Sequence, residues 1–146
     1  MLSKMAQSVK YSLNQKIVRA KSACQDFRLY DFGSYALNRL TPRTGYTLHK
    51  NIAYGLKARQ RLDIFCSTRP RSQRPLIVFV HGGAWLHGDK KDYRFVGEAF
   101  AKEGYDVAII NYHLAPEYIF PSYIDDLSLA LNYLTQHQLK LKIQAE

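Results

Sequence analysis

The spacing of hydrophobic residues changes along this chain, and each spacing predicts a different element. In the first 25 residues an apolar side chain recurs every three or four positions, at Leu2, Met5, Val9, Leu13, Ile17, Ala20 and Cys24. That period places these side chains on one face of a helix. Tyr46 to Tyr54 and Leu62 to Cys66 instead indicate strands, the second with a clear period of two. With a turn at residues 55–58 between them, they predict an antiparallel pair.

Two unbroken apolar runs predict strands that are buried on both faces. They are Leu76 to Val80 and Val107 to Ile110. Such β-branched runs are typical of a central parallel strand. Between them Asp89 predicts the start of a helix with an apolar stripe, and Gly104 predicts its end. The segment therefore predicts one strand–helix–strand unit, and after the antiparallel pair we expect a mostly parallel sheet.

A second helix is predicted after Pro121. Ser122 is the expected N-cap, and Asp125 and Asp126 are expected to complement the positive end of the helix. We expect its buried face to consist of Ile124, Leu127, Ala130, Leu131 and Leu134. The chain closes with a short alternating tail, residues 139–143. Near the start, the breaker cluster 41–45 predicts a boundary between a helical extension with its linker (1–45) and an α/β domain (46–146).

Charge and cysteine content narrow the class of protein. Of 146 residues, 21 are Lys or Arg and 12 are Asp or Glu, which gives a formal net charge of +9. The excess lies in residues 1–25 and in a second cluster of Arg59, Arg61, Arg69, Arg71 and Arg74. No nucleic-acid motif accompanies either basic cluster, so we expect a solvated surface and no nucleic-acid partner. Cys24 and Cys66 follow no metal spacing, which favours free thiols in a reducing compartment. The absence of a secretory signal pattern predicts a cytoplasmic location.

The face of residues 1–25 opposite the apolar stripe is basic, and three interpretations stay open. The helix packs on the following domain, lies on an anionic membrane surface, or serves as an organelle transit peptide. No stretch is long and apolar enough in sequence to predict a membrane span.

The stretch from His81 to Gly88 carries the clearest chemical signal. It reads His-Gly-Gly-Ala-Trp-Leu-His-Gly and directly follows the strand predicted at Leu76 to Val80. Glycines let the main chain come close to a ligand and adopt positive φ. Backbone N–H groups held in such a loop can stabilise the negative oxygen that forms during acyl transfer.

From about Asn51 onward the chain resembles the esterase/lipase branch of the α/β-hydrolases, near its feruloyl-esterase-like and kynurenine-formamidase-like groups. The resemblance rests on motifs in order: Tyr54-Gly55, Arg61 to Phe65, His81 to Trp85, Gly88 to Lys90, Gly104 to Val107, Asn111 to Glu117, Phe120-Pro121 and Asp126. It implies a serine hydrolase that cleaves ester or related acyl bonds of small molecules, with no metal or organic cofactor.

The resemblance also assigns residues within the loop. The oxyanion donors correspond to the N–H groups of Gly82, Gly83 and Ala84, with Ala84 in place of a frequent third glycine. His81 is expected to shape the loop, and Trp85 to anchor the packing or to line a substrate pocket. His113 stands in place of a frequent arginine.

Other titratable residues favour structural roles. His87 and His113 have no acid or nucleophile assigned nearby, and helix capping explains Asp125 and Asp126.

A nucleophile is missing from this sequence. The fold places its serine in a G-x-S-x-G turn, followed by an acid and a histidine, and no serine here lies in that pattern. None of the triad is therefore present, and we expect the N-terminal part of a hydrolase, inactive alone, with an unpaired edge on the strand at Leu76 to Val80. Two alternatives stay open: a non-catalytic protein that binds a membrane or partner through its basic helix, and half of a split hydrolase completed by a C-terminal chain.

Overall fold

The computed structural model describes residues 32–41, 43–73 and 75–143. Their elements, in chain order, are β1 (Tyr46–Ala53), β2 (Arg61–Ser67), β3 (Ile77–Val80), the 3₁₀ helix η1 (Lys90–Tyr93), α2 (Arg94–Lys102), β4 (Val107–Ile110), α3 (Ser122–Gln136) and α4 (Gln138–Leu141). Residues 32–40 are also helical. The predicted helix in residues 1–25, its membrane contact and Cys24 lie outside the described residues.

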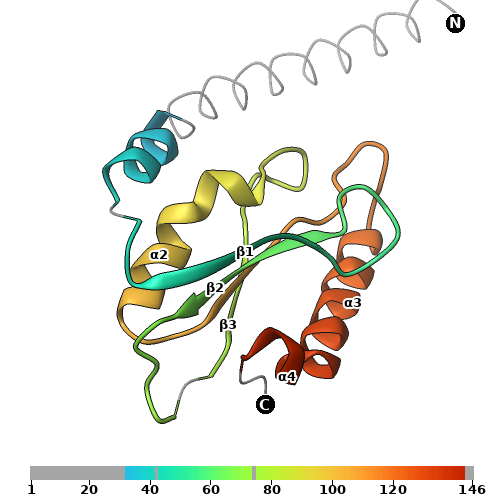
Figure 1. Cartoon of the computed structure of the whole chain (residues 1–146). Helices are drawn as coiled ribbons and strands as arrows, with labels where there is room; N and C mark the ends of the chain where they lie inside the picture. Colours follow the sequence, from blue (N-terminus) through green and yellow to red (C-terminus); the bar gives the residue numbers. More distant parts are fainter. Residues whose placement is uncertain (1–31, 42, 74, 144–146) are drawn as a thin grey trace, which may run out of the picture.

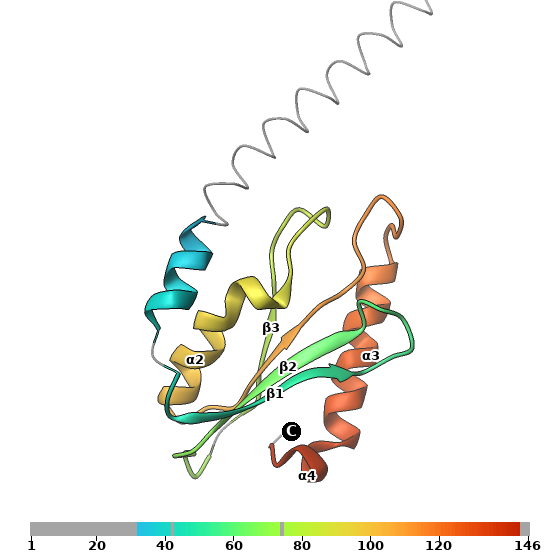
Figure 2. The same cartoon turned by 45° about the horizontal axis from the view of Figure 1, so that its top comes forward.

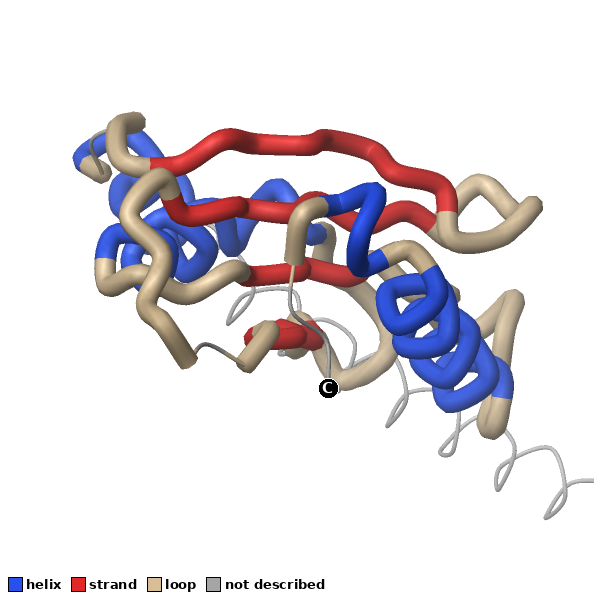
Figure 3. Tube along the Cα trace, turned by 60° about the horizontal axis from the view of Figure 1, so that its bottom comes forward, coloured by secondary structure: helices blue, strands red, loops and turns tan. Residues whose placement is uncertain are grey.

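The four strands form one sheet in the order β1-β2-β4-β3, seen obliquely in Figure 3. β1 and β2 are antiparallel, as predicted, and β4 is antiparallel to β2. β3 and β4 are parallel and are joined through α2, which confirms the strand–helix–strand unit. We expected a mostly parallel sheet. The described sheet has one parallel pairing because only one such crossover occurs in the described residues.

Helices cover both faces of the sheet, with α2 on one face and α3 on the other (Figures 1 and 2). The alternation of side chains along β4 divides the core accordingly. Val107 and Ile109 belong to the cluster on the α2 face, and Ala108 and Ile110 to the cluster on the α3 face. All four are fully buried. The fold is therefore the α/β architecture that the apolar runs predict.

One prediction about a helix end was wrong in detail. Pro121, not Ser122, occupies the N-cap position of α3, and no side chain caps that end. The tail that alternates in sequence is helical at α4, because Leu141 and Ile143 turn into the core on the α3 face. Asp89 does cap the segment before α2, where its carboxylate accepts a hydrogen bond from the Lys91 N–H at 3.0 Å.

The helix at residues 32–40 docks on the start of α2, whereas we expected only the approach to a linker there. The Asn38 amide donates to the carbonyls of Lys91 (3.0 Å) and Asp92 (3.2 Å) and accepts from the Phe95 N–H (2.9 Å). Its side chain thus joins two helices more than 50 positions apart. Among the described helices, none is long and apolar enough to cross a membrane.

Candidate active site

The glycine loop, residues 81–88, leaves the sheet at the carboxyl end of β3. The segment that follows β4 leaves from the same end, because the two strands are parallel. Figures 1 and 2 show both segments projecting beyond this edge. Two hydrogen bonds join them: the Tyr112 hydroxyl donates to the His81 carbonyl at 2.7 Å, and the Ala115 N–H donates to the Trp85 carbonyl at 2.8 Å. In α/β sheets this edge is where ligands bind.

The loop has a conformation that requires glycine at two positions. Gly83 has φ +128° and Gly88 has φ +106°. A Cβ atom would lie 2.1 Å from the His87 carbonyl oxygen at Gly83, and 2.6 Å from the His81 ring at Gly88. Ala84 and Trp85 also have positive φ, +51° and +63°. This left-handed region is unfavourable for residues with a Cβ.

The hydrogen bonds that hold the loop end on its carbonyl oxygens. They do not use the N–H groups that are predicted to be oxyanion donors. The Gly83 carbonyl accepts from the N–H groups of Leu86 (3.0 Å) and His87 (3.2 Å), and the His87 Nδ1 lies 2.7 Å from it. Among the described residues, no hydrogen bond uses the N–H of Gly82, Gly83 or Ala84 as its donor. Gly82 and Ala84 are exposed and Gly83 is half-buried. All three N–H groups are therefore available to an acceptor.

Arg59 fixes the far end of the loop and was not identified from the sequence, where it was assigned to a solvated basic cluster. Its guanidinium donates to the Gly88 carbonyl at 2.9 Å and to the Tyr112 carbonyl at 2.7 Å. It thereby ties the segments after β3 and β4 to the turn after β1. Only the arrangement of three distant segments reveals this role.

His81 is buried, with 2% of its surface exposed. Its ring stacks on Tyr112 at 4.5 Å and on Tyr93 at 5.9 Å between centroids. Nδ1 lies 2.8 Å from the Gly82 carbonyl, which can only accept, so this nitrogen carries the proton. Burial lowers the pKa of the imidazole below 6.5 and outweighs the hydrogen bond to Gly82. A neutral, stacked ring fits a residue that shapes the loop.

Trp85 lies at the tip of the loop and is 45% exposed. It stacks on Tyr123 of α3, with ring centroids 4.3 Å apart and planes 10° apart. One face of the indole therefore anchors the loop to α3, while the rest remains open to a ligand. The geometry accommodates both interpretations made from the sequence.

Asp126 and His113 form a buried pair, which corrects two predictions. The Asp126 Oδ2 lies 2.5 Å from the His113 Nδ1 and accepts from the His113 N–H at 2.7 Å, so His113 does have an acid beside it. The Asp126 Oδ1 accepts from the Gln60 amide at 2.9 Å. Asp126 points inward rather than capping α3, because its helical position faces the sheet. Asp125, its neighbour, is exposed.

A polar cluster anchors the start of the following helix. Asn111 accepts from the Lys90 N–H at 2.6 Å and donates to Asp89 at 3.0 Å. Burial raises the pKa of Asp89, but the bonds from Lys91 and Asn111 outweigh it and lower the pKa overall. Lys90 is paired with Asp63 at 2.7 Å. The cluster fixes the residues immediately after the loop.

Within the described residues, no group of three or more His, Cys, Asp or Glu side chains is placed to hold a metal ion. Cys66 is a half-buried thiol on β2, and its Sγ lies 3.7 Å from the Leu141 carbonyl oxygen.

Comparison with known proteins places this geometry in a family. The BD-FAE family matches residues 62–146. Kynurenine formamidase from Drosophila melanogaster is 30% identical over 106 residues, which is 73% of this chain. The crystal structure of a bacterial heroin esterase covers 80% of the chain at 27% identity with a TM-score of 0.68. Esterase B from Lactobacillus rhamnosis covers 85% at 22% identity with a TM-score of 0.71, a likeness of fold.

The chain spans less than half of each of these proteins. It corresponds to 35% of the formamidase, 38% of the heroin esterase and 40% of esterase B. The residues that the family matches, 62–146, include the glycine loop.

Proposed function

This chain belongs to the BD-FAE family, and we propose that it supplies the oxyanion loop of a carboxylesterase-like serine hydrolase. The observation that carries the proposal is that the N–H groups of Gly82, Gly83 and Ala84 donate to no described acceptor, on a loop that is held through its carbonyl oxygens. The proteins that this chain resembles are named as a formamidase and as esterases, and both names denote enzymes that act on acyl compounds. The proposed substrate is the ester or related acyl bond of a small molecule.

The proposed chemistry is electrostatic stabilisation of the transition state. Attack on a carbonyl carbon moves negative charge onto its oxygen, and a preorganised donor aimed at that oxygen contributes about 3–4 kcal/mol. The loop is preorganised by two kinds of contact. The carbonyl oxygens of Gly83, Gly88 and His81 accept hydrogen bonds, and the His81 ring stacks on its aromatic neighbours. Those contacts use carbonyl oxygens and a ring, so they leave the three N–H groups free to donate to the oxygen.

The nucleophile, acid and base are proposed to come from residues outside these 146. The sequence contains no G-x-S-x-G turn. β3 is hydrogen-bonded to β4 on one side, and in the described sheet it has no strand on the other. We propose that the polypeptide that carries the serine adds a strand beside β3, either further along the same product or as a separate C-terminal chain. The 146 residues alone are then inactive.

An activity test distinguishes this proposal from a complete enzyme. The purified chain is incubated with p-nitrophenyl acetate and with a fluorophosphonate probe that labels activated serines. We expect neither turnover nor labelling, with the bacterial heroin esterase as the positive control. Specific turnover together with stoichiometric labelling of one serine would contradict the proposal that the chain is inactive.

A complementation test addresses the loop itself. The coding DNA beyond codon 146 is read in all frames, and unlinked genes are searched, for a segment with G-x-S-x-G followed by Asp and His. We expect turnover only when that segment is combined with this chain, and none when its serine is replaced by alanine. Full activity of the segment without this chain would refute the role of the loop.

A further inference from the structure

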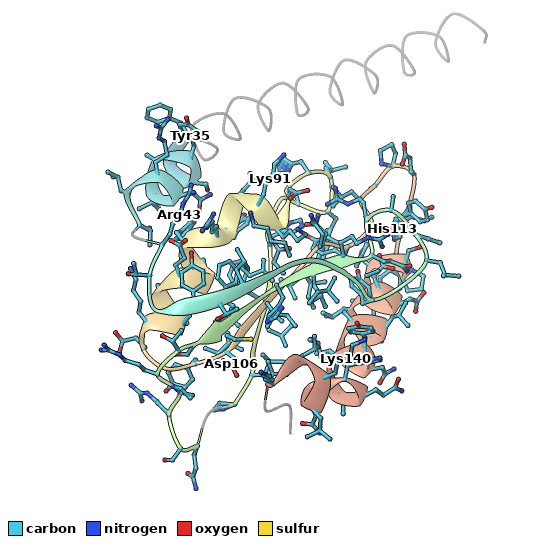
Figure 4. The ribbon with its side chains drawn as sticks, in the orientation of Figure 1. Tyr35, Arg43, Lys91, Asp106, His113 and Lys140 are labelled. Atoms are coloured by element: carbon cyan, nitrogen blue, oxygen red, sulfur yellow. The ribbon has the colours of Figure 1, made fainter. Side chains whose placement is uncertain are left out.

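A basic cleft of about 460 Å³ lies between the helix at 32–40, β1 and the residues that begin α2. Its lining includes six cationic side chains: Arg39, Arg43, Lys50, Lys90, Lys91 and Arg94. Figure 4 shows Tyr35, Arg43 and Lys91, three of its lining residues, gathered on one side of the molecule. The cleft uses none of the proposed oxyanion donors, so it does not depend on the proposed function.

The walls of the basic cleft are fixed by contacts already described. Asn38 holds the helix at 32–40 against the Lys91 and Asp92 carbonyls, which sets the outer wall. Leu48 and Phe65 contribute apolar surface, and Phe65 is 1% exposed. The volume lies in the range of small-molecule sites, about 300–1,000 Å³. The cleft therefore has a rigid apolar base beneath a charged rim.

The positive charge of the cleft is only partly neutralised. Asp63 and Asp89 are the two carboxylates in the lining, which leaves an excess of four positive charges. Asp63 is engaged by Lys90 at 2.7 Å. Asp89 accepts from the Lys91 N–H and from Asn111, at 3.0 Å each. These carboxylates are therefore occupied by groups at the base of the cleft.

Among the described residues, four of the six lining cations form no ion pair, and one of these, Arg39, donates to the Tyr35 hydroxyl at 2.9 Å. Arg94 is paired with Glu98 at 2.7 Å. Among the described residues, Arg43, Lys50 and Lys91 form no ion pair, and all three side chains are exposed. They come from three segments, so their convergence on one cleft is a product of the fold. Like charges held together repel one another unless an anion lies between them.

We propose that the basic cleft binds a small ligand that carries phosphate. Phosphate accepts several charge-assisted hydrogen bonds at once, and arginine and lysine are its usual partners. The Arg43 guanidinium and the ammonium groups of Lys50 and Lys91 bind the phosphate oxygens. The apolar surface of half-buried Leu48 contacts the organic part. The same chemistry serves a soluble phosphate ester and a phospholipid headgroup.

The proposal is tested by calorimetric titration of the full chain with inorganic pyrophosphate at physiological ionic strength. The test variant carries Arg43→Gln, Lys50→Gln and Lys91→Gln. The control variant carries Arg69→Gln, Lys102→Gln and Lys140→Gln, which removes the same charge from exposed residues outside the cleft. We expect the Kd to rise about tenfold or more in the test variant and less than about twofold in the control.

Flotation with vesicles of phosphatidylcholine, with and without phosphatidic acid, distinguishes the source of the phosphate. If the wild type binds pyrophosphate and the test variant does not, the ligand is a soluble phosphate compound. If the wild type binds only the vesicles that contain phosphatidic acid, and the test variant does not, the ligand is a phospholipid headgroup. An equal loss in the control variant, or no binding to either probe, overturns the proposal. Melting curves of both variants confirm that they are folded.

Discussion

At the scale of single residues, adjacent glycines of the loop differ in what surrounds them. A Cβ at Gly83 would overlap the His87 carbonyl, and φ is +128°. A Cβ at Gly82 would meet nothing closer than the Tyr93 hydroxyl at 3.9 Å. The chain itself therefore requires glycine at position 83 but not at position 82.

Replacing each glycine with alanine tests this difference. Gly83→Ala is expected to lower the free energy of unfolding by roughly 2–4 kcal/mol, through backbone strain and overlap. Gly82→Ala is expected to change it by less than about 1 kcal/mol. Urea denaturation of both variants measures the difference. Equal effects would show that the loop does not have the conformation described.

His81 gives the molecule a pH dependence of predictable sign. Burial lowers the pKa of the folded imidazole below 6.5, so below that pH the unfolded chain binds the proton more readily. The free energy of unfolding therefore falls as the pH drops from 6.5 to the folded pKa, by at most about 1.4 kcal/mol per pH unit. Above 6.5 the contribution is fully present.

The matched measurement compares the wild type with His81→Gln and with His49→Gln, since His49 is exposed on β1. Urea denaturation is followed from neutral pH to about 5. The loss of stability should be smaller in His81→Gln and unchanged in His49→Gln. If the free energy of unfolding of His81→Gln falls with pH as steeply as that of the wild type, another group causes the effect.

At the scale of elements, the segment after β4 is held to α3 through one carboxylate. Asp126 accepts from the backbone and ring of His113 and from Gln60 of the turn before β2. Three donors in a buried setting lose their acceptor if the carboxylate is removed. Unsatisfied buried donors are expensive, whereas exposed carboxylates of a helix contribute little.

Asp125 and Asp126 provide a matched pair for this argument. Asp126→Ala is expected to lower the free energy of unfolding by roughly 3 kcal/mol, because it leaves buried donors unsatisfied. Asp125→Ala, at an exposed position, should change it by less than about 0.5 kcal/mol. Thermal unfolding reports both values. Similar losses would favour the capping role expected from the sequence.

At the scale of the whole molecule, the sheet has an apolar edge at β3. The Ile77 N–H donates to the Asp106 carbonyl beside β4 at 2.9 Å. Successive backbone groups of a strand point to opposite sides, so the N–H and C=O of Val78 point away from β4. Unpaired groups of this kind are a template for a further strand.

Val78→Pro removes the outward N–H without removing a bond to β4. We expect the 146-residue chain to self-associate at micromolar concentration through this edge, and Val78→Pro to reduce that association. Val78→Ala is the control, because it loses a similar side chain but keeps the N–H. Sedimentation velocity compares the three. Association that persists in Val78→Pro would place the contact elsewhere.

The amino-acid sequence by itself determined the local structure and the position of the glycine loop. Apolar periodicity is a local property, so β1 to β4 and α2 could be predicted within a few residues. The requirement for glycine in the loop also follows from backbone sterics. The alternating tail shows the limit of such patterns, since α4 forms where Leu141 and Ile143 reach the core.

Only the tertiary structure decided the partners of the polar residues. Gln60 and Asp126 lie 66 positions apart, and Asn38 lies 53 positions from Lys91. Arg59 was expected in solvent and instead fixes the loop through Gly88. A local pattern cannot specify such pairs, because the geometry that brings them together is set by packing on the two faces of the sheet.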